Sequence, residues 1–175
     1  SHSPSPARAH GLLCGDLSPG PANRITDVAG VSVGHSTVRN GDFKTGFTAI
    51  VPHAGNLFLE KLPAGADVIN GFGKSAGLIQ IEELGTLETP ILLTNTFAVG
   101  TGINALIRRE LSINPGIDRS GGTVNPVVME CNDGYLSDIN AMILSEADAF
   151  AALDAASTDF EQGSVGAGTG ISAFG

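Results

Sequence analysis

Alternation of apolar with polar residues predicts β-strands in the first third of the chain. Between residues 24 and 38 (RITDVAGVSVGHSTV) it indicates one strand, or a bent pair of strands broken at Gly30. The alternating apolar positions there are Ile25, Val31 and Val33. A second apolar, β-prone run covers residues 46–51. The dipeptide Asn40-Gly41 favours a tight turn, so we expect the two runs to form a hairpin.

Further along the chain the apolar residues follow a helical period. Residues 68–85 predict a short strand, a glycine turn and then a helix that ends at Gly85, and residues 96–111 predict a longer helix. The apolar positions at helical spacing are Leu78, Ile81 and Leu84 in the first helix and Ile103, Leu106, Ile107 and Leu111 in the second. Ser145 with Asp148 has the pattern of a capping box before an Ala-rich helix over residues 150–156.

Two short apolar runs predict buried strands between these helices. ILLTN follows Pro90, and VNPVVME covers residues 124–130, where Pro126 favours an edge strand or a bulge. Residues 1–23 are rich in Ser, Pro, Ala and Gly without any period, and no linker or repeat interrupts the rest. We therefore expect an N-terminal arm over residues 1–23 and one mixed α/β layered domain over residues 24–175.

Composition narrows the classes of partner. With 18 acidic and 9 basic residues the formal net charge is −9, which would repel nucleic acid, because such binding depends on Lys and Arg neutralising phosphates. No apolar run reaches the ~18 residues of a membrane span. The four histidines show no metal-ligand spacing, so we expect no metal and no cofactor. Cys14 and Cys131 are expected to be free thiols, with a disulfide as the alternative.

The low content of charged residues, 15%, indicates a surface that another subunit covers in part. A soluble monomer rich in Gly and Ala has the same composition, and the alternative stays open. Localisation is equally open between cytoplasm and periplasm, since the first residues contain no apolar core of a secretion signal.

Two glycine-rich motifs are similar to nucleotide-binding motifs, but neither matches the full pattern. GFGKS, residues 71–75, would need glycine at Val68 to form a phosphate-binding loop. GAGTG, residues 166–170, lacks the following helix and the later acidic residue of a dinucleotide fingerprint, which makes close backbone packing the better interpretation. The sequence also contains no Gly-x-Ser-x-Gly elbow, so a complete catalytic triad within this chain is not predicted.

The segment Glu130-Cys131-Asn132-Asp133-Gly134 places polar side chains directly after an apolar strand, where residues often line a cleft. A carboxylate there can pair with an ammonium group, and a hydrogen bond to a charged group contributes roughly 1.5–3 kcal/mol. The alternative is an Asx turn at Asn132 with Glu130 simply solvated. Cys131 is interpreted as a small buried hydrophobe, because no histidine is close in sequence to support a thiolate.

Six blocks of the sequence, taken together, resemble one family of enzymes. The blocks are NRITDVAGVSVGHST, KTGFTAIVP, GADVINGFGKSAG, PILLTNTFAVGTG, NPVVMECNDGYLSDI and GSVGAGTG. They follow the order found in the L-aminopeptidase/D-alanine esterase-amidases and β-peptidyl aminopeptidases, from about residue 24 to the C-terminus. The combination of ITDVAGVxVGH with VGAGTG is specific, so the chain is similar to the large subunit of such an enzyme.

The resemblance implies a four-layer αββα sandwich like that of N-terminal-nucleophile hydrolases, completed by a second chain. Members are made as one precursor that cuts itself and exposes a serine or threonine at the start of the smaller chain. That hydroxyl attacks the substrate carbonyl, with the adjacent α-amino group, which titrates near pH ~8, as its base. Substrates are short peptides, amides or esters with a free amino terminus, of L, D or β configuration.

The resemblance also implies roles for four residues of this chain and none in the chemical step itself. Glu130 matches the carboxylate that holds the substrate's ammonium group, and Asn132 with Asp133 would shape the same pocket. Some relatives have tyrosine where this chain has Asn132, so the contact made by that tyrosine is not expected here. Asn95, in LLTNT, is a further candidate pocket residue.

The partner expected from the resemblance is a small subunit with an N-terminal Ser or Thr, in a homo-oligomer of such heterodimers. In the family the large chain continues past GxGTG before the cut, so we expect residues to be missing after Gly175 rather than a cut directly behind it. Two alternatives remain: an amide hydrolase for pantetheine-like or oligoamide substrates, and a non-catalytic binding subunit.

Overall fold

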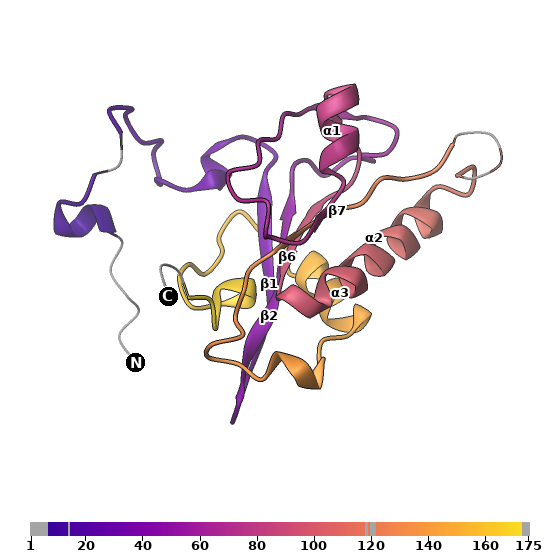
Figure 1. The fold of residues 1–175 in the computed structure, drawn as a ribbon. Helices are drawn as coiled ribbons and strands as arrows, with labels where there is room; N and C mark the ends of the chain where they lie inside the picture. The colour runs from indigo at the N-terminus through magenta and orange to yellow at the C-terminus, as the bar shows by residue number, and fades with distance from the viewer. Residues whose placement is uncertain (1–6, 14, 118, 120–121, 173–175) are drawn as a thin grey trace.

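The computed structural model describes residues 7–13, 15–117, 119 and 122–172, and these form a five-stranded sheet with helices on both faces (Figure 1). The strand order is β1-β2-β6-β7-β4. The strands are β1 Ser32–Asn40, β2 Phe43–Val51, β4 Ser75–Ala76, β6 Ile91–Thr94 and β7 Val127–Glu130. A separate two-stranded sheet pairs β3 Leu62–Pro63 with β5 Thr86–Leu87. The helices are α1 Leu78–Leu84, α2 Val99–Ile113 and α3 Glu146–Asp154.

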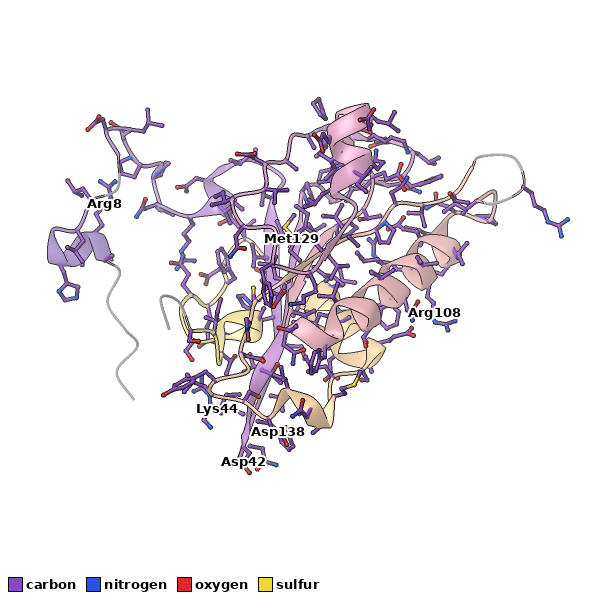
Figure 2. The ribbon with its side chains drawn as sticks, in the orientation of Figure 1. Arg8, Asp42, Lys44, Arg108, Met129 and Asp138 are labelled. Carbon is purple, nitrogen blue, oxygen red and sulfur yellow. The ribbon has the colours of Figure 1, made fainter. Side chains whose placement is uncertain are left out.

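The predicted hairpin is confirmed. β1 and β2 pair antiparallel from Ser32↔Val51 to Asn40↔Phe43, and Gly41 in the turn has φ of 56°, a conformation that suits glycine. The segment after β7 packs against the hairpin tip, where the backbone N–H of Asp138 donates to the carbonyl of Asp42 at 2.9 Å (Figure 2).

The strand expected at Ile25 is wrong, because residues Ile25–Asp27 form a short 3₁₀ helix, η2. The Asp27 carboxylate accepts hydrogen bonds from the backbone N–H groups of Ala22 and Arg24 at 3.0 and 3.2 Å. Such local side-chain bonds compete with extended backbone, so the alternation of apolar residues misled the prediction there.

Parallel pairing of β6 with β7 forms the centre of the sheet, with Ile91 opposite Val127 and Thr94 opposite Glu130. The expectation that Pro126 marks an edge strand or a bulge is wrong, because β7 lies between β6 and β4. Pro126 directly precedes the first residue of β7, where its missing N–H costs no ladder bond. The short strand expected near residue 68 is also not formed, and the strand of that stretch is β4.

The three predicted helices are confirmed with shifted ends. α1 ends at Leu84, and Gly85 forms its C-cap, with a φ of 66° and an N–H bond to Ile81 O at 2.8 Å. α2 begins after a 3₁₀ turn, η3, over Thr96–Ala98. α3 begins at Glu146 rather than Phe150, because the capping box of Ser145 and Asp148 sets its first turn.

Helices α2 and α3 cover one face of the sheet (Figure 1) and enclose the main core. The core residues fully shielded from solvent include Phe47, Ala49, Leu92, Ala105, Leu106, Val128, Ala149 and Ala152. β1 and α3 approach so closely that a Cβ on Gly34 would lie 2.1 Å from the carbonyl oxygen of Ala152. Small residues on both elements therefore set the spacing between this face and α3.

On the other face, α1 and β5 pack over β7 through Ile81, Leu87 and Val127. Beside them the C-terminal segment crosses β1 and β2, with the 3₁₀ helix η5, Gly166–Gly168, against the sheet. A Cβ on Gly166 would lie 2.4 Å from Thr48 Oγ1, so GAGTG is a close-packing motif, as the sequence indicated.

These layers confirm the predicted α/β class. Helices α2 and α3 form one layer and the five-stranded sheet the next. In the four-layer αββα prediction, a second chain completes the sandwich. Among the residues that the structure describes, no helix combines the length and the apolarity needed to cross a bilayer.

Candidate active site

Polar side chains gather where the parallel strands β6 and β7 end. Asn95 and Thr96 directly follow β6, and Glu130 is the last residue of β7. Because the carboxyl ends of parallel strands meet at the same sheet edge, residues 34 positions apart in sequence come into contact: Thr96 Oγ1 donates to Glu130 Oε1 at 2.6 Å. This edge is the usual place for ligand sites in α/β sheets.

The carboxylate of Glu130 is held at both oxygens. Oε1 accepts from Thr96, and Oε2 accepts from the backbone N–H of Lys74 at 2.5 Å. Lys74 Nζ lies 3.8 Å from Oε2, and the Glu130 side chain is 7% exposed. The alternative of a solvated Glu130 is therefore wrong: the carboxylate is fixed in orientation and keeps lone pairs for a further cation.

Asn132 and Asp133 differ sharply in exposure. Asn132 is exposed, and its Oδ1 accepts the N–H of Gly134 at 2.9 Å, which is the Asx turn considered from the sequence. Asp133 is 1% exposed, and neither carboxylate oxygen has a hydrogen-bond partner in the described part of the chain.

Burial raises the pKa of the Asp133 carboxyl, and the nearby polar groups of Thr45 and Asn95 lower it in part. Thr45 Oγ1 also accepts a hydrogen bond from Asn95 Nδ2 at 3.0 Å. The pKa of the Cys131 thiol is raised by burial first and then by the charges of Asp133 and Glu130. A raised pKa disfavours the thiolate, in keeping with a Cys131 that is not a nucleophile.

Asn95 uses both ends of its amide inside the fold. Its Oδ1 accepts the N–H of Ala98 at 3.0 Å, which caps η3, and its Nδ2 donates to Thr45 Oγ1 at 3.0 Å. These bonds fix the turn between β6 and α2, which also carries Thr96. A contact between Asn95 and substrate stays a prediction.

Sequence reasoning missed Lys74 and Thr96. Lys74 is the lysine of the GFGKS motif, which was considered only for phosphate and set aside. Its contact with Glu130 spans 56 residues and arises from the pairing of β4 with β7. No local pattern in either segment could have shown it.

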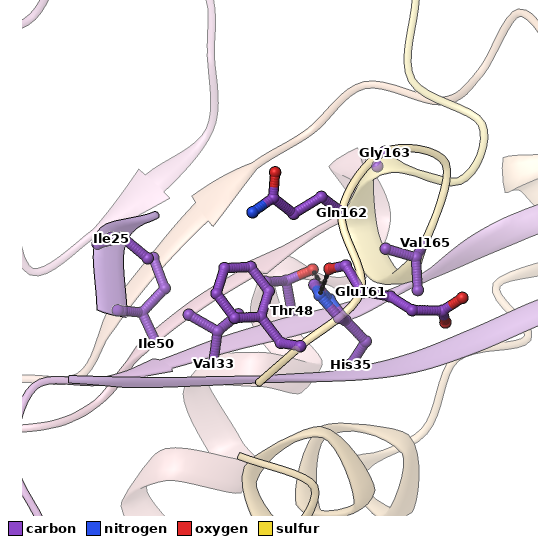
Figure 3. Close-up of a pocket in the computed structure, with 11 residues that line it drawn as sticks. Ile25, Val33, His35, Thr48, Ile50, Glu161, Gln162, Gly163 and Val165 are labelled. Carbon is purple, nitrogen blue, oxygen red and sulfur yellow. Dashed lines mark hydrogen bonds between the residues drawn. The ribbon is translucent and has the colours of Figure 1, made fainter. Parts of the chain in front are cut away.

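A cavity of about 300 Å³ lies elsewhere, on the sheet face opposite α3 (Figure 3). His35 lies in its wall, with Nδ1 2.9 Å from Thr48 Oγ1 and Nε2 3.0 Å from the carbonyl oxygen of Glu161. A carbonyl only accepts, so Nε2 carries a proton. None of the four predicted site residues lines this cavity. Among the described residues, no group of three His, Cys, Asp or Glu side chains could hold a metal ion.

Comparison with known proteins now decides the family. Residues 23–175 match the sequence family described as Peptidase family S58. The chain belongs to peptidase family S58. The resemblance noted in the sequence blocks is thereby confirmed.

Curated relatives of this S58 chain include two β-peptidyl aminopeptidases named BapA. The protein of Sphingosinicella xenopeptidilytica is 38% identical over 167 residues, which is 90% of this chain and 41% of that protein. The protein of Sphingosinicella microcystinivorans is 35% identical over the same shares. The S58 chain therefore spans less than half the length of these relatives.

Solved structures similar to the S58 chain share its fold closely. The PH0078 protein of Pyrococcus horikoshii OT3 superposes with a TM-score of 0.91 at 48% identity, covering 96% of this chain and 50% of that one. A Burkholderia sp. β-aminopeptidase gives a TM-score of 0.85 at 43% identity, covering 94% and 47%.

The L-aminopeptidase D-Ala-esterase/amidase of Ochrobactrum anthropi gives a TM-score of 0.82 at 33% identity, covering 97% of this chain and 49% of that one. That enzyme is described as a prototype serine aminopeptidase with a variant of the N-terminal-nucleophile hydrolase fold. The S58 chain shares this fold, as the sequence blocks predicted.

Proposed function

We propose that this chain is the large subunit of a self-cleaving aminopeptidase or amidase whose nucleophile is an N-terminal Ser or Thr on a companion chain. Three observations support the proposal. The chain belongs to peptidase family S58, it spans about half of the structures it resembles, and its sequence predicts no complete catalytic triad.

The observation that carries the proposal is the fixed carboxylate of Glu130. Two hydrogen bonds, from Thr96 Oγ1 and Lys74 N, orient a side chain that is 7% exposed at the sheet edge. In this role Glu130 receives the α- or β-ammonium group of the substrate and thereby sets the distance from the amino terminus to the bond that is cut. Asp133 and Asn132 shape the adjacent wall.

The companion chain supplies the chemistry in this proposal. Its terminal hydroxyl adds to the substrate carbonyl while its α-amino group takes the proton, and hydrogen-bond donors stabilise the oxyanion. The intermediate then breaks its C–N or C–O bond, the proton passes to the leaving amine or alcohol, and an acyl-enzyme ester remains. Water hydrolyses that ester, releases the N-terminal residue and restores the hydroxyl.

Large apolar side chains on the surface support a companion chain and further assembly of the heterodimers. Ile79 and Leu84 of α1 are 80% and 68% exposed, and Leu59 is 71% exposed. Burial of such residues in subunit contacts is favourable, at roughly 25 cal/mol per Å² of apolar surface.

Intact mass spectrometry and Edman degradation of the full-length gene product test the assembly. We expect two polypeptides, the smaller beginning with Ser or Thr. A single uncut polypeptide that hydrolyses amino-terminal substrates would contradict the self-cleaving mechanism.

Glu130→Gln tests the ammonium site. We expect the KM for β-alanyl, D-alanyl or L-aminoacyl p-nitroanilides to rise about tenfold to a hundredfold, the range of a lost charge-assisted hydrogen bond. Glu83→Gln, which changes an exposed acid on α1, is the matched control and should leave KM unchanged. An unchanged KM in Glu130→Gln would refute the assignment.

A further inference from the structure

Lys74 contacts the candidate ammonium anchor in two different ways. Its backbone N–H donates to Glu130 Oε2 at 2.5 Å, and its carbonyl accepts the N–H of Glu130 at 3.0 Å. The next residue, Ser75, begins β4 and pairs with Met129 of β7. The backbone of Lys74 is therefore tied to β7, whatever its side chain does.

The ammonium group of Lys74 is held more weakly than its backbone. Nζ lies 3.8 Å from Glu130 Oε2, beyond the 2.7–2.9 Å of a charge-assisted hydrogen bond. The same Nζ lies 4.1 Å from the centre of the Phe72 ring, within range of a cation–π contact. The Lys74 side chain is 46% exposed, and its ammonium group contacts both a carboxylate and an aromatic face.

The surroundings allow the lysine to leave the carboxylate. Phe72 is 78% exposed and stands between Gly71 and Gly73, around which a Cβ would meet no atom closer than 3.8 Å. The Phe72 ring already contacts the ammonium group, so Nζ keeps this partner when the contact at 3.8 Å is lost. Glu130 would keep its two short hydrogen bonds in the meantime.

We propose that Lys74 is a displaceable counter-ion of Glu130, which competes with the substrate's ammonium group and so limits the affinity of the site for amines. This inference rests on the proposed function, because it takes Glu130 as the ammonium anchor. When substrate binds, Nζ moves away from Oε2 but stays over the Phe72 ring, so two positive charges remain near one carboxylate. Their mutual repulsion weakens the binding of every substrate with a free amino terminus.

The inference predicts that removing the positive charge of Lys74 strengthens the binding of substrates with a free amino terminus. In the processed two-chain enzyme, Lys74→Met keeps the aliphatic stem beside Phe72 and removes the charge. We expect KM for aminoacyl p-nitroanilides, and Ki for a simple alkylammonium inhibitor, to fall about threefold to tenfold, as for like charges in partly screened surroundings. The change should be larger in KM than in kcat, because the lysine acts on binding through Glu130.

Lys74→Arg is the control that keeps the charge, and its KM and Ki should not fall below those of the parent enzyme. Lys74→Gln is a second neutral variant, and thermal melting verifies that each variant folds. If KM and Ki rise or stay constant in both neutral variants, or fall equally in Lys74→Arg, the inference is wrong.

Glu130→Gln, measured in parallel, separates the inference from the proposed function. A raised KM in Glu130→Gln without a lower KM in Lys74→Met overturns the counter-ion role and leaves the ammonium anchor standing. An unchanged KM in Glu130→Gln overturns both.

Discussion

The contact between Gly34 and α3 allows a sharp test of the packing. Gly34→Ala adds one methyl group whose carbon would lie 2.1 Å from the carbonyl oxygen of Ala152 and 2.6 Å from the backbone nitrogen of Ala156. Both atoms belong to backbone at the end of α3, so no side-chain rotation relieves the clash. α3 must move away from the sheet by about 1 Å or more, since close-packed interiors do not absorb such an overlap.

That movement opens the core around Ala149 and Ala152, which are fully buried. Overpacking costs typically 1–3 kcal/mol, and because a whole helix shifts here we expect the upper end, about 3 kcal/mol. For a protein of this size 1 kcal/mol corresponds to roughly 2–4 °C, so the melting temperature should fall by about 6–12 °C. Differential scanning calorimetry of the assembled enzyme measures it.

Gly100→Ala is the matched control. Gly100 lies in the first turn of α2, and a Cβ there would meet nothing within 4 Å. The same substitution should therefore raise stability, by up to about 1 kcal/mol, through helix propensity. Equal effects of the two substitutions, or a neutral Gly34→Ala, would refute the steric argument.

Three further predictions concern the site edge and α3. Thr96→Val removes the hydroxyl that donates to Glu130 Oε1 at 2.6 Å, and it should raise KM for amino-terminal substrates about threefold to tenfold. Thr96→Ser keeps a hydroxyl and should have a KM near that of the parent enzyme. Equal KM values of the two variants would contradict this role of the hydroxyl. Burial raises the folded-state pKa of Asp133 above its unfolded value, so the stability contributed by this group is full at low pH and lost as pH rises through the folded pKa. Asp133→Asn should therefore flatten the pH dependence of the melting temperature and raise it at neutral pH; an unchanged profile would count against the burial argument. Ser145→Ala breaks the capping box of α3 and should cost about 1 kcal/mol of unfolding free energy, measured by denaturant titration, and no loss would show that packing alone sets the start of α3.

Local signals explain the parts of the fold that the sequence predicted well. Asn40-Gly41, Gly85 and the pair Ser145/Asp148 each specify backbone geometry through their own chemistry, and the structure has a turn, a helix end and a helix start there. The alternation around Ile25 failed because a nearby carboxylate, Asp27, formed competing bonds. Periodicity alone could not weigh those bonds.

The candidate site was predictable only in part for a different reason. Glu130 stands out as an acid at the end of an apolar strand, but its partners Thr96 and Lys74 come from segments that only the parallel β6–β7 pairing and the β4–β7 pairing bring to it. Burial of Asp133 was equally hidden, because its turn-forming neighbours suggested exposure.

Long-range ties of the C-terminal segment have a consequence for biosynthesis. The backbone N–H of Ala167 donates to Thr48 Oγ1, and that of Gly166 to Thr37 Oγ1, across 119 and 129 residues of chain. At translation rates of about 5–20 residues per second, synthesis of the C-terminal segment that packs on β1 and β2 follows synthesis of these strands by roughly 6–25 s. During that interval we expect the sheet face of the nascent chain to be exposed to solvent, as a surface that chaperones could shield.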